Sequence, residues 1–113
     1  GVFITGPTKG IESLNIEAFR LVAHEVREIG LTPIIQHEVA DGLDLQEWEF
    51  NNECASVLSK CAVVVTIEDW HEDELSTSLV KMAQILKKRI VTTANMSKSL
   101  TNYWNEIQEK IAA

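Results

Sequence analysis

The segment Ala62-Val63-Val64-Val65-Thr66-Ile67 constrains the fold more than any other part of this 113-residue chain. It is continuous, apolar and rich in β-branched residues, without the polar alternation of a strand that has one face in water. Such a run is typical of a central parallel strand that is buried on both faces. A strand of this kind needs helices on both sides, so the rest of the chain must supply them.

Three other short apolar segments resemble strands, and helical patterns separate all four. The predicted strands are 1–5, 31–35, 62–67 and 89–94; the predicted helices are 16–29, 46–59, 75–86 and a last one from Ser97 or Ser99 through Ile111. Asn15 is expected to cap the first helix and Gly30 to end it. Strands alternating with helices predict right-handed crossovers and a parallel sheet. We expect one domain over residues 1–113, a small doubly wound α/β fold (Rossmann- or flavodoxin-like) with four to five strands.

The charge is concentrated in the middle of the chain. The net charge is −7, from 10 Lys and Arg against 17 Asp and Glu, and between His37 and Glu74 the only base is Lys60. An acidic middle argues against a nucleic-acid partner and against binding to an anionic membrane surface. No apolar run approaches the roughly 18 residues of a membrane span, and no secretory leader is visible. We therefore expect a cytoplasmic location, in the host cytoplasm if the chain is phage-encoded.

The cysteines and histidines indicate no metal or cofactor. Cys54 and Cys61 are the only cysteines, and we interpret them as reduced thiols. Two cysteines with three scattered histidines form no zinc pattern. The acidic loop 68–74 contains His71 and offers possible ligands for a divalent cation, but it lacks the glycine and the regular spacing of a calcium loop. The prediction is therefore that the protein holds no metal and no cofactor.

In a doubly wound fold the ligand crevice lies at the carboxyl ends of the strands. Those ends are here 6–10, 36–44, 68–74 and 95–98. The loop 6–10 is not a Walker loop, because it lacks that spacing and the Lys-Ser/Thr pair. Its backbone can still line a ligand, and a Trp at a strand end can stack on a base. The predicted ligand-binding residues are Gly6, Pro7, Thr8, Lys9, Gly10, His37 and Trp70.

Several sequence motifs, taken in their order along the chain, resemble those of the nucleoside 2-deoxyribosyltransferase superfamily. Within that superfamily they resemble a small phage and bacterial branch of unassigned function, which is related to the deoxynucleoside monophosphate N-glycosidases. The resemblance covers about Val2 to Thr93. It rests on the opening strand and glycine loop 2–10, on Asn15-Ile16-Glu17-Ala18-Phe19 (similar to Asn-x-Pro-Ala-Phe), on Trp48, on Cys61-Ala62-Val63-Val64-Val65 (similar to Cys-Asp-Ala-Val) and on Trp70. Relatives in this superfamily are oligomers, so the resemblance implies a homo-oligomer.

The sequence departs from the superfamily's pattern at the acidic positions. After the Trp, the branch has a Ser, a Gly and then the nucleophilic Glu; these places fall on Asp73, Leu75 and Leu79. Two further acidic places fall on Ala62 and Cys54. Cleavage of an N-glycosidic bond needs a carboxylate close to the anomeric carbon. A leucine supplies none, so the pattern predicts a loss of catalysis, with Leu79 in the core beside Leu75, Met82 and Leu86.

These observations lead to three hypotheses. The first is a catalytically inactive domain, a pseudoenzyme, that binds a nucleoside-type small molecule or a protein partner. The second is an active N-glycosidase or deoxyribosyltransferase with a relocated carboxylate, for which Glu53, Asp73 and Glu74 are the candidates. The third is a phage-type acidic interaction or inhibitor protein that mimics nucleic acid. The acidic side chains near loop 68–74 would repel a 5′-phosphate, which favours a nucleoside over a nucleotide.

Overall fold

The computed structural model describes residues 1–112. Its centre is a four-stranded sheet formed by β1 (Val2–Thr5), β2 (Pro33–Ile35), β3 (Val63–Thr66) and β4 (Arg89–Thr92). The strand order is β2-β1-β3-β4, and every neighbouring pair is parallel. All four residues of β1 and of β3 are buried. The predicted doubly wound α/β fold is therefore confirmed, with the 63–66 segment as a central strand.

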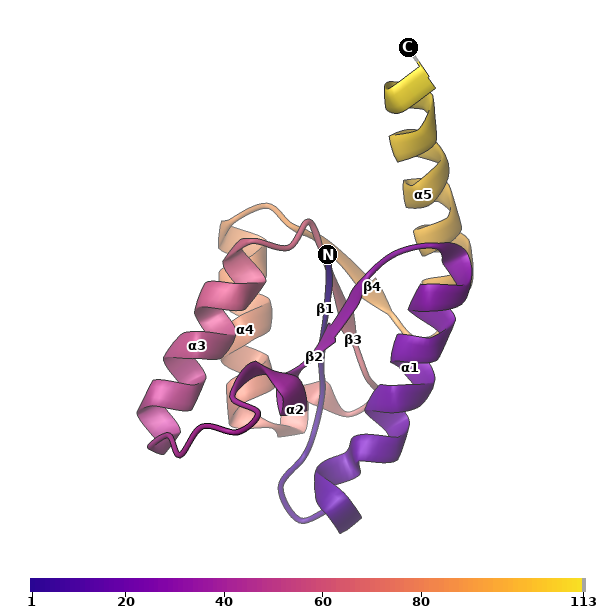
Figure 1. Cartoon of the computed structure of the whole chain (residues 1–113). Helices are drawn as coiled ribbons and strands as arrows, with labels where there is room; N and C mark the ends of the chain where they lie inside the picture. The colour runs from indigo at the N-terminus through magenta and orange to yellow at the C-terminus, as the bar shows by residue number, and fades with distance from the viewer. Residues whose placement is uncertain (113) are drawn as a thin grey trace.

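Helices cover both faces of the sheet (Figure 1). On one face lie α1 (Ile16–Ile29) and α5 (Met96–Ala112), and on the other lie α3 (Glu47–Ser59) and α4 (Glu74–Ile85), with the short α2 (Gln36–Val39) beside α3. Two short 3₁₀ turns, η1 (Glu12–Asn15) and η2 (Trp70–Glu72), precede α1 and α4. The C-terminal half of α5 extends beyond the body of the domain.

The alternation of side chains along the strands divides the core in two. Val2 and Ile4 of β1 belong to the cluster that packs on α1 and α5. Phe3 points to the opposite face and packs with Val64, Leu58 and Leu79 against α3 and α4. Successive strand residues face opposite sides of a sheet, so an apolar strand without polar alternation serves both clusters. The cavity described below lies on the α3 and α4 side.

Four local predictions differ from the structure. The expected loop after β2 begins with a helical turn, α2. Asn15 makes no side-chain cap; its backbone is left-handed, and its Nδ2 donates instead to the Pro7 carbonyl at 2.9 Å. The last helix begins at Met96 rather than after Ser97 or Ser99. Leu86 is 46% exposed because it follows the end of α4. By contrast, Gly30 ends α1 in the predicted left-handed conformation.

None of the helices within residues 1–112 combines the length and the apolar character needed to cross a membrane.

Candidate functional site

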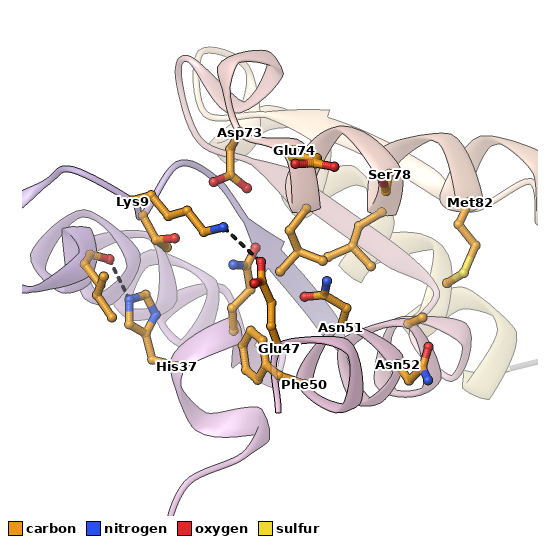
Figure 2. A pocket seen from close by; sticks show the side chains of 16 residues that line it. Lys9, His37, Glu47, Phe50, Asn51, Asn52, Asp73, Glu74, Ser78 and Met82 are labelled. Carbon is orange, nitrogen blue, oxygen red and sulfur yellow. Dashed lines mark hydrogen bonds and ion pairs between the residues drawn. The ribbon is translucent and has the colours of Figure 1, made fainter. Parts of the chain in front are cut away.

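A cavity of about 590 Å³ opens between α3 and α4 at the carboxyl edge of the sheet (Figure 2). Its wall comes from four places: the β1–α1 loop, the start of α2, the first three turns of α3, and the beginning and middle of α4. It is lined by Thr8, Lys9, Leu14, Gln36, His37, Glu47, Phe50, Asn51, Asn52, Ala55, Asp73, Glu74, Leu75, Ser78, Leu79 and Met82. Its volume lies in the range of small-molecule sites.

A buried hydrogen-bond network ties together the elements that meet beside the cavity. Thr5 Oγ1 hydrogen bonds to Gln36 Oε1 and lies 2.9 Å from Ser76 Oγ, and the Ser76 hydroxyl donates to the Gly6 carbonyl at 2.9 Å. Thr5, Gln36 and Ser76 are each at most 2% exposed. The network therefore joins the end of β1, the start of α2 and the first turn of α4 in one fixed arrangement.

Gly6 occupies the point where the chain leaves the sheet between the two central strands. A Cβ at this position would lie 2.6 Å from the Cβ of Ile67, which follows β3. Real Cβ atoms do not approach so closely, so only glycine fits here without displacing β3. The structure thus explains the first glycine of loop 6–10 by packing between β1 and β3 at the topological switch point of the sheet.

One base and three acids lie at the cavity. Lys9 from the β1–α1 loop forms an ion pair with Glu47 of α3 at 3.0 Å, and both side chains are largely exposed. The dashed line between them in Figure 2 crosses from one wall to the other. The hydrogen bond and the charge of Glu47 raise the pKa of Lys9, and the charges of Asp73 and Glu74 raise it further. With neutral His37, the lining has a net charge of −2.

Asp73 has a structural role that limits its chemistry. It is 8% exposed, and its Oδ2 accepts a hydrogen bond from the Ser76 backbone N–H at 2.9 Å, which caps α4. Glu74 is exposed in the first turn of the same helix and lines the cavity. Glu53 is exposed on α3 and lies outside the lining. Of the three candidate carboxylates, Glu74 is the one that faces the cavity without a hydrogen-bond partner among the described residues.

His37 lines the cavity and holds the β1–α1 loop. Its Nε2 lies 2.7 Å from the Leu14 carbonyl, and its ring meets Phe19 edge-on at a centroid distance of 4.5 Å. A carbonyl only accepts, so Nε2 carries a proton and donates it to Leu14. Nδ1 is enclosed and has no hydrogen-bond partner within residues 1–112. Leu14 itself is one of three successive left-handed residues, 13–15.

The middle of α4 forms an apolar part of the cavity wall. Leu79 is 3% exposed and packs in the core with Phe3 and Val64. It also borders the cavity, together with half-buried Leu75 and Met82. The predicted place of Leu79 in the core is confirmed. The sequence predicted an apolar stripe on α4 made of Leu75, Leu79, Met82 and Leu86. The buried face of the helix is rotated relative to this stripe, because its wholly buried positions also include Val80 and Ala83.

The structure brings together only part of the predicted ligand-binding set. Thr8, Lys9 and His37 line the cavity, whereas Gly6, Pro7, Gly10 and Trp70 do not. Trp70 is half-buried in η2, edge-on to His71 at a centroid distance of 6.0 Å. The sequence reasoning missed the side chains from α2 and α3, namely Gln36, Phe50, Asn51 and Asn52. The start of α3, residues 47–52, combines two acids, two aromatic residues and two amides, and this is the signal that could have found the last three.

The two cysteines and the acidic loop lie apart from the cavity. Cys54 and Cys61 are free and buried. Burial, with the nearby Glu53 charge, raises the pKa of Cys54 to about 12, and burial also raises the pKa of Cys61. In the acidic loop, side-chain ligand atoms of Asp69, His71 and Glu72 lie within 4.8 Å of one another, all of them exposed. Exposed carboxylates commonly gather in this way without a metal, so this cluster alone assigns no site.

The fold and the cavity define a small doubly wound α/β domain with a ligand-sized site between two helices on one face of its sheet. The family model described as "Domain of unknown function (DUF4406)" matches residues 1–92, so the chain belongs to the DUF4406 family. The match includes all four strands and both helices of the cavity, and it ends before α5. No curated protein matches the chain at a significant level.

Proposed function

We propose that the domain binds an uncharged nucleoside-type small molecule in the cavity between α3 and α4 and does not cleave its glycosidic bond. The observation that carries the proposal is the apolar side chain of Leu79 in the cavity wall, at the place where the resemblance sets the nucleophile. A leucine can neither form a glycosyl ester nor stabilise a cationic sugar. It can pack against a flat apolar ring.

The composition of the wall suits a heterocycle with polar edges. Leu75, Leu79 and Met82 provide an apolar face on α4, and Phe50 provides an aromatic ring on α3. Figure 2 shows Phe50 and Asn51 on the wall opposite Glu74 and Ser78. Small-molecule sites combine a mainly apolar lining with a few polar groups that fix orientation. The side-chain amides of Gln36, Asn51 and Asn52 offer both donors and acceptors to such a ring.

The charges around the cavity favour a neutral ligand. Lys9 is already paired with Glu47, and Asp73 and Glu74 leave the lining with a net negative charge. A 5′-phosphate would meet this charge at short range, and because most of these side chains are exposed, dissolved salt screens part of the repulsion. We therefore expect nucleosides to bind more tightly than the matching monophosphates. The difference should shrink as the ionic strength rises.

Calorimetric titration with the four 2′-deoxynucleosides and their monophosphates tests this proposal, with chromatography of the same mixtures for released base. We expect binding of at least one nucleoside and no base release above the rate without protein. Leu79→Ala, which removes the wall, should weaken binding, whereas Ile85→Ala on an exposed face of α4 should not. Absence of binding to every nucleoside, by a protein shown to be folded, would refute it.

A second function is favoured by Glu74, which faces the cavity at the start of α4. In this proposal Glu74 replaces the lost nucleophile, and the domain is an active N-glycosidase or deoxyribosyltransferase. The test compares Glu74→Gln with Glu53→Gln, an equal change of charge outside the cavity. Base release by the wild type that is abolished by Glu74→Gln and kept by Glu53→Gln would establish this function and rule out the inactive domain.

A further inference from the structure

Gln36 is a buried amide whose orientation is fixed by its surroundings. The side chain is 2% exposed at the start of α2, directly after β2, where it lines the cavity. The Gly6 backbone N–H donates to its Oε1 at 3.4 Å, and the Thr5 hydroxyl bonds to the same oxygen. A backbone N–H can only donate, so the oxygen must face Gly6. The nitrogen Nε2 is therefore held on the other side of the amide.

Nε2 carries two N–H groups without a partner in the described part of the chain. None of the side-chain hydrogen bonds within residues 1–112 involves this atom. Among the described residues, His37 Nδ1 is the side-chain atom that is both fully enclosed and without a hydrogen-bond partner. Nε2 of Gln36 also has no partner but is not fully enclosed, and because Gln36 lines the cavity, Nε2 retains a path to it. Buried amides almost always have their donors satisfied. A donor held in place and left open to a cavity is the arrangement of a ligand-recognition group.

We propose that Gln36 selects the ligand by donating a hydrogen bond from Nε2 to a carbonyl oxygen or ring nitrogen of an uncharged heterocycle. This inference rests on the proposed function and names the ligand atom that the site recognises. Phosphate and carboxylate oxygens are also acceptors, but Glu47, Asp73 and Glu74 oppose an anion in the same cavity. The neutral acceptors of a nucleobase remain: the carbonyl oxygens of pyrimidines and guanine, and the ring nitrogens of purines.

The first test compares ligands on the unaltered protein, so it does not depend on a variant that folds. The probe is the 2′-deoxynucleoside that binds most tightly, against its shape analogue without the acceptor: a difluorotoluene deoxyriboside for thymidine, or a deaza analogue for a purine. A buried donor that loses its acceptor should reduce affinity about tenfold or more. In ¹H–¹⁵N spectra, the side-chain NH₂ pair of Gln36 should shift with the nucleoside and much less with the analogue.

The second test removes the donor. Gln36→Met keeps the length of the side chain and should bind the nucleoside and its analogue within about twofold of each other. Gln84→Met, the same change on an exposed position of α4 outside the cavity, should keep the wild-type discrimination. Wild-type protein that binds the nucleoside and every such analogue equally would overturn the role of Gln36 and leave the proposed function standing. Failure to bind any nucleoside would overturn both.

Discussion

Thr5 Oγ1 and Ser76 Oγ lie 2.9 Å apart in the interior, between the last residue of β1 and the first turn of α4. The two residues are 71 positions apart in the chain, and neither is exposed to solvent. Their contact, with Gln36 beside it, sets the position of α4 relative to the sheet. It thereby sets one wall of the cavity, so a polar interaction in the core determines the geometry of the candidate site.

Replacing Thr5 by Val should therefore destabilise the domain. The isosteric methyl group removes the hydroxyl that donates to Gln36 Oε1 and places an apolar group against Ser76 Oγ in a buried place, which costs about 1–3 kcal/mol of unfolding free energy. Thr66→Val is the matched control on β3, where the hydroxyl makes a single 3.4 Å hydrogen bond to the Val91 carbonyl. Urea denaturation measures both. An equal loss for the two variants would show that the network contributes nothing beyond an ordinary strand threonine.

Leu79 and Leu86, two of the three leucines in the predicted α4 stripe, should respond differently to truncation. Leu79→Ala removes a buried side chain that packs on Phe3 and Val64, and core truncations of this type cost about 2–5 kcal/mol. We expect a value near the lower limit, because the side chain also borders an open cavity. Leu86→Ala at the exposed end of the helix should cost within about 0.5 kcal/mol. Thermal or urea unfolding distinguishes them, and a reversed order would contradict the observed rotation of the stripe.

The buried thiol of Cys54 predicts a pH dependence of stability with a definite sign. Its pKa is raised from the ordinary value of 9.0 to about 12, mainly by burial and then by the charge of Glu53. Between these values the unfolded chain has lost the thiol proton while the folded chain keeps it. Since the unfolded state then binds fewer protons, stability falls as the pH rises through this window.

The measurement is the free energy of unfolding from pH 7 to pH 10.5 for the wild type and for Cys54→Ala. The wild type should lose more stability over this range than the variant, because other groups that titrate there are common to both. Ellman's reagent at pH 8 gives an independent check: both buried cysteines should react slowly in the folded protein and rapidly in urea. Parallel pH profiles would contradict the assigned burial of this thiol.

The fold could be predicted from the sequence because local patterns and global fold agree. The apolar run 62–67 requires two covered faces, and the helical segments before and after it supply them. The positions of Leu79 in the core and of Gly30 at a helix end follow from the same local rules. The stripe including Leu86 could not be placed so well, because the end of α4 is decided by where β4 begins.

The site was harder to predict because its groups come from distant segments. Lys9 and His37 follow strand ends, where the topology predicts a crevice, and both line the cavity. Gln36 is set by its contacts with Thr5 and Gly6, which no spacing in the sequence reveals. Trp70 follows a strand end too, yet it lies in η2 and outside the lining of the cavity. The homo-oligomer implied by the resemblance stays a prediction, which sedimentation would test.

Asp73 is a carboxylate with a structural role, and its variants test whether that role is its only one. As the cap of α4, it accepts from the Ser76 N–H. Asp73→Asn keeps an oxygen acceptor at that position and should change the unfolding free energy by only a few tenths of a kcal/mol, whereas Asp73→Ala should cost about 0.5–2 kcal/mol. Glu72→Ala, one residue earlier and exposed, controls for the loss of charge.

If capping α4 is the only role of Asp73, the Asp73→Asn variant should bind nucleosides at least as tightly as the wild type. If base release is detected in the wild type and is lost in Asp73→Asn at unchanged stability, Asp73 acts on the ligand and the inactive-domain proposal fails.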